Sequence, residues 1–213
     1  MTATITPEPA DKPFDFIAGE LCLDFCNSDE SLGGPEDWSY EYLLHWSQKA
    51  GDLSDHDAAA LRRLAARNAT EAGRIARRSL ELRKVLLRLF YTAAHGDPAI
   101  SEDLKALNKE VADTMAQTRL EPAGSGYSLN CCSDDDPQLA RPLWPIVRSA
   151  VDLLTTGDLD RLGECASHDC EYLFVDSTRN RSRQWCDTKV CGNRERVHRH
   201  REKKKELTVQ SDR

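Results

Sequence analysis

The sequence has no apolar run close to the roughly 20 residues that a membrane-spanning helix requires, and its mean hydropathy is −0.61. Residues 1–14 contain neither a basic segment nor an apolar core of the kind found in secretory signals. Internal repeats, a glycine-rich phosphate loop and a nucleophile–base motif are also missing. These absences predict a cytoplasmic protein without a membrane partner and without enzymatic activity.

Charge is present in excess and is unevenly distributed. The chain of 213 residues has a net charge of −7. Between Arg179 and Lys205, eleven Arg and Lys face only three acidic residues, which gives this segment +8 and leaves −15 for the rest. Such a split predicts an acidic body that carries a basic arm.

Composition and periodicity divide the chain into four segments and predict an α+β fold. The body is expected to be mainly α-helical with a small antiparallel sheet, and a hairpin with a basic helix is expected to follow it. The predicted segments are a disordered leader at 1–13, the body at 14–157, a cysteine-containing basic module at 158–206 and a disordered tail at 207–213.

Within the body, the apolar alternation of Leu21, Leu23 and Phe25 predicts a half-buried strand. Helical spacing and capping residues predict the body helices, and Gly124-Ser125-Gly126 predicts a hairpin turn. The expected helices span about 36–49, 54–68, 70–94, 101–115 and 137–156, with Gly157 as the final C-cap.

Four of the eight cysteines are arranged in two equal pairs. Cys165 and Cys170 enclose four residues, as do Cys186 and Cys191, and fifteen residues separate the pairs. Two such knuckles joined by a hairpin-sized insert suit one tetrahedral Zn²⁺, and four thiolates close its coordination shell. We therefore expect one structural zinc ion, which replaces a core that about forty residues are too few to build.

Other interpretations of these cysteines stay open at this stage. Unrelated core cysteines and disulfides are alternatives, although a reducing compartment disfavours disulfides. His168 lies between the first two cysteines and is an alternative ligand.

The residues around the last cysteine resemble a known family. Cys191-Gly192-Asn193-Arg194, preceded by the run from Asp176 to Cys186, resembles the CGNR zinc finger. Leu23-Asp24-Phe25-Cys26-Asn27 resembles the LDFxN signature of the ABATE domain, with Ser28 where that family commonly has Thr. The resemblance covers about residues 14–205. It implies a bacterial transcription regulator, sometimes described as stress-induced, with zinc held by Cys165, Cys170, Cys186 and Cys191.

The basic arm is the expected nucleic-acid contact. A helix is predicted from Asn193, as its cap, to Glu206. Arginine can bind phosphates and read guanine edges, although charge runs are more often solvated surfaces. Arg194 could instead support the thiolates, and Arg183 could stack on Trp185. The candidate contacts are Arg179, Arg181, Arg183, Arg194, Arg196, Arg199, Arg201, Lys203 and Lys204.

The body contains weaker candidates for a functional site. Asp24 and Asn27 follow apolar residues. Either their side chains form internal hydrogen bonds that support the fold, or they line a ligand pocket. Core packing is the favoured interpretation of Cys22, Cys26, Cys131 and Cys132, with a second metal or redox site as the alternative.

The sequence thus favours a DNA-binding transcription regulator whose acidic body senses a small-molecule effector or forms a homodimer. The alternative is a zinc-dependent module that binds protein or RNA and has no promoter role. The DNA target, the effector, the oligomeric state and the sign of regulation are not encoded in any motif found.

Overall fold

The computed structural model describes residues 14–28, 38–131 and 138–211, with side chains in the last helix described as far as Glu202. The predicted leader at 1–13, Cys132, and the side chains of Cys131, Lys203 and Lys204 lie outside the described part.

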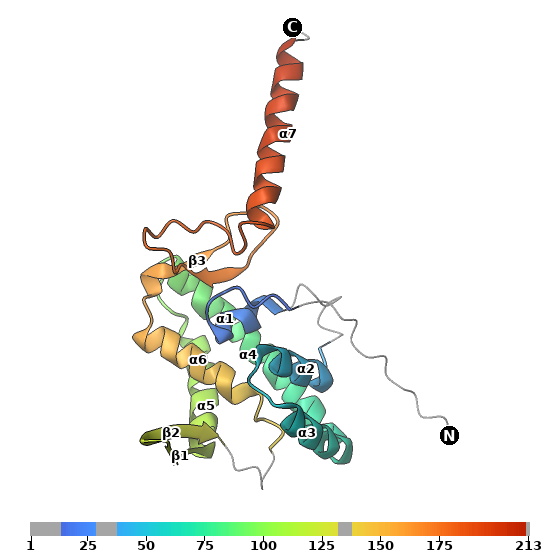
Figure 1. Cartoon of the computed structure of the whole chain (residues 1–213), viewed down its shortest axis with the longest axis vertical. Helices are drawn as coiled ribbons and strands as arrows, with labels where there is room; N and C mark the ends of the chain where they lie inside the picture. The colour runs from blue at the N-terminus through green and yellow to red at the C-terminus, as the bar shows by residue number, and fades with distance from the viewer. Residues whose placement is uncertain (1–13, 29–37, 132–137, 212–213) are drawn as a thin grey trace, which may run out of the picture.

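The body is built around helix α4 (Ala69–Ala94), which runs through its centre (Figure 1). Because Ile75, Leu82, Leu86 and Leu89 repeat at helical spacing, α4 presents one buried apolar face to its neighbours. The helices around it are α1 (Leu21–Cys26), α2 (Tyr40–Ala50), α3 (Asp55–Arg67) and α5 (Ser101–Gln117), and α6 (Leu143–Thr156) packs on α1 and α5.

Local capping chemistry sets several helix boundaries. Ser39 and Ser54 each accept a hydrogen bond from a backbone N–H in the first turn of α2 and α3, at 3.1 Å in both cases. Pro142 and Pro145 lie at the start of α6, where a missing N–H costs no helical bond. Gly157 ends α6 in an extended conformation. A Cβ at this position would lie 2.4 Å from the carbonyl oxygen of Leu153, which explains the glycine.

Two small antiparallel sheets complete the fold. Strands β1 (Thr118–Ala123) and β2 (Gly126–Cys131) form the hairpin that the sequence predicted around Gly124. After the 3-10 turn η3 (Leu159–Arg161), strands β3 (Leu162–Glu164) and β4 (Leu173–Val175) pair beside α4. The predicted fold class, a mainly helical body with a small antiparallel sheet and a C-terminal four-cysteine module, is confirmed.

Three local predictions were wrong. Residues 21–26 form helix α1 rather than a strand, because Cys22 and Cys26 are buried as completely as Leu23 and Phe25. The insert between the cysteine pairs does not form the expected hairpin by itself, because its strand β4 pairs with β3, upstream of the first cysteine. Helix α7 runs from Cys191 to Ser211, so it begins before Asn193 and continues into the predicted disordered tail.

Helix α7 projects away from the rest of the molecule (Figure 1). Its exposed side chains, from Asn193 through Arg201, include Val197, and only Glu195 within this stretch is half-buried. Among the described residues, no helix combines the length and apolarity needed to cross a membrane.

Candidate metal centre and basic helix

The four paired cysteines converge at one point. Their sulfur atoms all lie within 4.8 Å of one another, and the Sγ of Cys186 is 3.6 Å from those of both Cys170 and Cys191. Tetrahedral ligands at about 2.3 Å from Zn²⁺ lie about 3.8 Å apart, so this spacing fits the ion. Cys165, Cys186 and Cys191 are buried and Cys170 is half-buried, which suits a closed structural site.

The environment of the sulfurs shows why a cation is needed. Burial, opposed by hydrogen bonding, raises the pKa of Cys170 to about 12. Burial, together with the charge of the neighbouring thiols, raises the pKa of Cys186 well above its ordinary range. Thiolates held this close repel one another, so a divalent ion bound by all four would stabilise their charged form. The Cys186 N–H also points to the Cys165 sulfur at 3.4 Å.

Backbone pairing brings the two knuckles together. The Cys165 N–H donates to the Tyr172 carbonyl at 2.8 Å, and the Ala166 N–H donates to the Gln184 carbonyl at 2.8 Å. The buried Asp176 accepts hydrogen bonds from the backbone N–H groups of Thr178 and Arg183, which shape the returning loop. Hydrogen bonding with the Thr178 side chain is the main cause that lowers the pKa of Asp176, and these backbone bonds act in the same direction.

Arg183 has a structural position rather than an exposed one. Its guanidinium donates to the carbonyls of Ile17 at 2.8 Å and Val175 at 3.1 Å, and also to those of Trp185 and Cys186. The guanidinium carbon lies 4.3 Å from the centroid of the Phe174 ring. The side chain predicted as a nucleic-acid contact therefore joins the N-terminal segment, the hairpin and the second knuckle.

Asp24 and Asn27 lie where the body meets the finger. Asn27 donates to the Leu173 carbonyl at 2.9 Å and accepts from the Leu173 N–H at 3.0 Å, so it pairs with β4 as another strand would. Asp24 accepts from the Ala18 N–H at 2.9 Å. Burial is the main cause that raises the pKa of Asp24 to about 6. These bonds match the structural interpretation of both residues.

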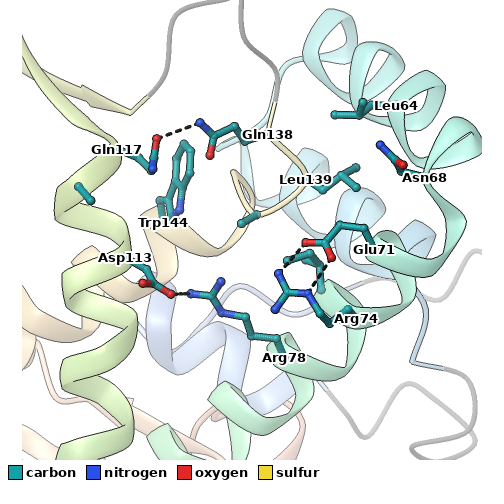
Figure 2. Close-up of a pocket in the computed structure, with 13 residues that line it drawn as sticks. Leu64, Asn68, Glu71, Arg74, Arg78, Asp113, Gln117, Gln138, Leu139 and Trp144 are labelled. Atoms are coloured by element: carbon teal, nitrogen blue, oxygen red, sulfur yellow. Dashed lines mark hydrogen bonds and ion pairs between the residues drawn. The ribbon is translucent and has the colours of Figure 1, made fainter.

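The body has a polar pocket at a different position. A cavity of about 390 Å³ opens between α3, α4, α5 and the start of α6, and Asp24 and Asn27 do not line it. Figure 2 shows Arg74 paired with Glu71 and Arg78 paired with Asp113, with the Gln117–Gln138 hydrogen bond beside Trp144. Trp144 forms part of the wall. Both arginines are already paired with carboxylates, at 2.6 Å for Arg74–Glu71 and 2.7 Å for Arg78–Asp113.

The residues after Cys191 have roles that differ from those expected. Gly192 has a helical backbone, and a Cβ there would lie 3.2 Å from the Trp185 ring, so close packing explains the glycine. Asn193 is not the N-cap, because it lies inside α7 and donates to the Lys189 carbonyl at 2.7 Å. The turn that leads into α7 is instead closed by Asp187, whose side chain accepts from the N–H groups of Lys189 and Val190.

The remaining predicted contacts are exposed but not equivalent. Arg194 donates to the Asp169 carbonyl at 3.3 Å, and Arg196 bonds to Asn193 on the same helix. Arg181 pairs with Asp158 at 3.0 Å and has a positive φ of 51°. Arg179, Arg199 and Arg201 are exposed, the last two on the projecting part of α7.

His168, Cys22 and Cys26 were further candidate metal ligands, and all three lie outside the four-cysteine cluster. His168 does not join the cysteine cluster; its Nδ1 lies 2.6 Å from Glu195 of α7. Sequence reasoning missed Glu195, although its spacing of three from His198 places both on one helical face. Cys22 and Cys26 are buried in α1, where burial raises the pKa of each thiol, and they lie apart from the four-cysteine cluster.

The fold and site together define a class: a helical body followed by a four-cysteine zinc finger that supports a cationic helix. Residues 19–157 match the ABATE family model, described as "Putative stress-induced transcription regulator". Residues 161–204 match the CGNR zinc finger. A search of the curated proteins gave no match. The chain belongs to the ABATE family and carries a C-terminal CGNR zinc finger, as the resemblance in the sequence indicated.

Proposed function

We propose that the chain is a DNA-binding transcription regulator in which α7 is the contact helix. The observation that carries this proposal is the projecting, cationic α7 (Figure 1), fixed at its first residue by the zinc ligand Cys191. A helix of this diameter enters the major groove of DNA, and arginine can bind both phosphates and guanine edges there. The family description supports the regulatory part of the proposal.

The structure narrows the set of candidate contacts. Arg183 is engaged by carbonyl groups and Arg181 by Asp158, which leaves five exposed arginines in the described part of the arm. These five are Arg179, Arg194, Arg196, Arg199 and Arg201. If about five phosphates are neutralised, log K should fall with log salt at a slope of about −4 to −5.

The deciding experiment is selection of bound duplexes from a random DNA pool by the full chain at a stated salt concentration. An enriched motif supports the regulator. Replacing Arg199 and Arg201 with Ala should weaken binding to all sequences and flatten the salt slope by about two. Lys84→Ala, which removes a surface cation of the body paired with Glu81, is the matched control. Failure to bind DNA even in low salt would overturn the proposal.

We propose that the body binds an effector or forms a dimer and has no catalytic role. We also propose that the protein is cytoplasmic. The cavity that Arg74 and Arg78 line is the feature that favours effector binding. The alternative function, a protein- or RNA-binding zinc module, predicts that the same exposed arginines bind RNA or an acidic protein while the random DNA pool yields no motif.

A further inference from the structure

A second group of metal-ligating side chains lies on the surface of the finger, outside the four-cysteine centre. His168, Glu195 and His198 place one ligand atom each within 4.8 Å of the others. His168 lies between the first two cysteines, and the other two residues lie one turn apart on α7. We propose that these three residues form a second, solvent-accessible site for a divalent transition-metal ion.

The carboxylate of Glu195 is held in place for this role. Its Oε1 accepts from the His168 N–H at 3.0 Å and from the Ser167 hydroxyl at 3.2 Å, and it lies 2.6 Å from His168 Nδ1. The described hydrogen bonds all end on Oε1, so Oε2 is available to an ion.

The two imidazoles approach the same carboxylate from different parts of the chain. Their ring centroids are 4.4 Å apart, with planes inclined by 38°. Both rings are exposed, so they can move without disturbing the core. The Nε2 of His168 lies 2.9 Å from Asp169 Oδ2, and its Nδ1 lies 2.6 Å from Glu195, so an ion would replace one of these two contacts. Among the described residues, His198 forms no hydrogen bond or ion pair and stacks on His168, so no polar bond holds it away from a ligand position.

The donor set identifies the class of ion. Two imidazole nitrogens and one carboxylate oxygen suit Zn²⁺, Ni²⁺ or Cu²⁺, whereas Mg²⁺ and Ca²⁺ prefer oxygen ligands. Three protein ligands leave at least one coordination position to water, unlike the closed four-cysteine shell. An ion bound here would join the first knuckle to the second turn of α7, and would exchange more readily than the structural zinc.

The test is a zinc titration of the full chain, without a histidine tag, that already holds its structural ion. Isothermal titration followed by elemental analysis after dialysis against Zn²⁺ should show a second equivalent. His198→Ala should weaken that second step by at least about tenfold, since even supporting residues of metal sites contribute that much. The same titration with Mg²⁺ should show no second step.

His200→Ala is the matched control, because His200 is exposed on the same helix and lies outside the cluster. It should keep both equivalents, while His198→Ala keeps only the tight one with unchanged helicity. A wild-type chain that binds one equivalent, or a His198→Ala chain that still binds two with wild-type affinity, would overturn the proposal. Since the readout is metal content, failure of DNA binding does not affect this test.

Discussion

The body and the finger keep their folds by different means. The body buries large apolar side chains against one another, as Phe25 and Trp46 do with ring centroids 5.1 Å apart. The finger has one small cluster, in which Phe174 packs with three of the four cysteines. The difference indicates that a short segment can orient a long helix through a metal centre. The side chains of α7 from Arg196 through Arg201 are exposed.

The body and the finger nevertheless pack against each other through apolar side chains, so a flexible linker does not separate them. Leu162 and Leu173 of the finger hairpin belong to the body core, while Ile17 of the body packs against the finger cluster. Asn27 and Arg183 add hydrogen bonds across the same boundary. The finger therefore depends on the body for its hairpin and on the metal for its knuckles.

The largest effect is expected from loss of the metal. Cys186→Ser removes a central thiolate, and structural zinc in small fingers contributes about 10–16 kcal/mol of apparent binding energy. We expect loss of the bound zinc, proteolytic cleavage between residues 165 and 191, and a lower unfolding midpoint of a body that stays helical. Elemental analysis, limited proteolysis and circular dichroism measure these three outcomes.

Cys22→Ser is the control for replacing a buried thiol without losing a zinc ligand, because Cys22 is fully buried but lies outside the cluster. It should lower the stability of the body and leave one zinc per chain. A Cys186→Ser chain that retains a full equivalent of zinc and a protected finger would contradict the proposed ligand set.

The next effect tests the shared boundary. Leu173→Ala removes a fully buried side chain of β4, which should destabilise the body by about 2–5 kcal/mol although the residue lies in the finger. Val190, also in the finger, is 55% exposed, and Val190→Ala should change stability by no more than about 0.5 kcal/mol. Denaturant unfolding followed by tryptophan fluorescence measures both. A change in Leu173→Ala as small as that expected for Val190→Ala would mean that the finger hairpin does not stabilise the body.

The sequence predicted different features of the body and of the finger correctly, and the reasons are physical. Equal cysteine spacing identified the metal centre because coordination geometry constrains spacing directly. Apolar periodicity identified α3 to α5, with a serine cap for α3, and the Gly124-Ser125-Gly126 turn identified the first hairpin. Helix α1 was missed because burial on all sides removes the periodic signal, so the alternation of Leu21, Leu23 and Phe25 carried no information.

Other features depend on contacts between distant parts of the chain. Nothing in the run of basic residues distinguishes Arg183, held by Ile17, from the exposed Arg199. Likewise, the spacing of the cysteines does not reveal that β4 pairs upstream with β3. The cluster of His168, Glu195 and His198 was partly accessible, since Glu and His three apart share a helical face.

A smaller effect is expected from Asn27. Asn27→Ala leaves the buried N–H and C=O of Leu173 without their partner, which should cost about 2–3 kcal/mol. The exposed Asn193 bonds within its own helix, and Asn193→Ala should cost less than about 1 kcal/mol. Hydrogen exchange of the Leu173 amide should accelerate in the first variant only. An unchanged exchange rate would show that Asn27 does not hold β4 to α1.

The smallest effect concerns Asp24, which lies at the same boundary. Its pKa is raised from 3.8 to about 6, mainly by burial, with Glu20 acting in the same direction. The N–H groups of Ala18 and Ile17 and the charge of Arg183 oppose the rise. A folded-state pKa above the unfolded value means that the fold favours the protonated carboxyl. Its contribution to stability is therefore complete below about pH 4 and is lost as pH rises through about 6.

Asp24→Asn keeps the oxygen that accepts from Ala18 and removes the charge. We expect equal stabilities of the two proteins near pH 4, and a variant more stable by roughly 2 kcal/mol at pH 7, a value reduced for solvent screening. Acid also weakens zinc binding by protonating the thiolates, so wild-type stability alone would mix two effects. The difference between variant and wild type cancels that shared contribution. Unfolding midpoints of both proteins across this range measure the difference, and a difference that stays constant with pH would show that Asp24 is charged throughout.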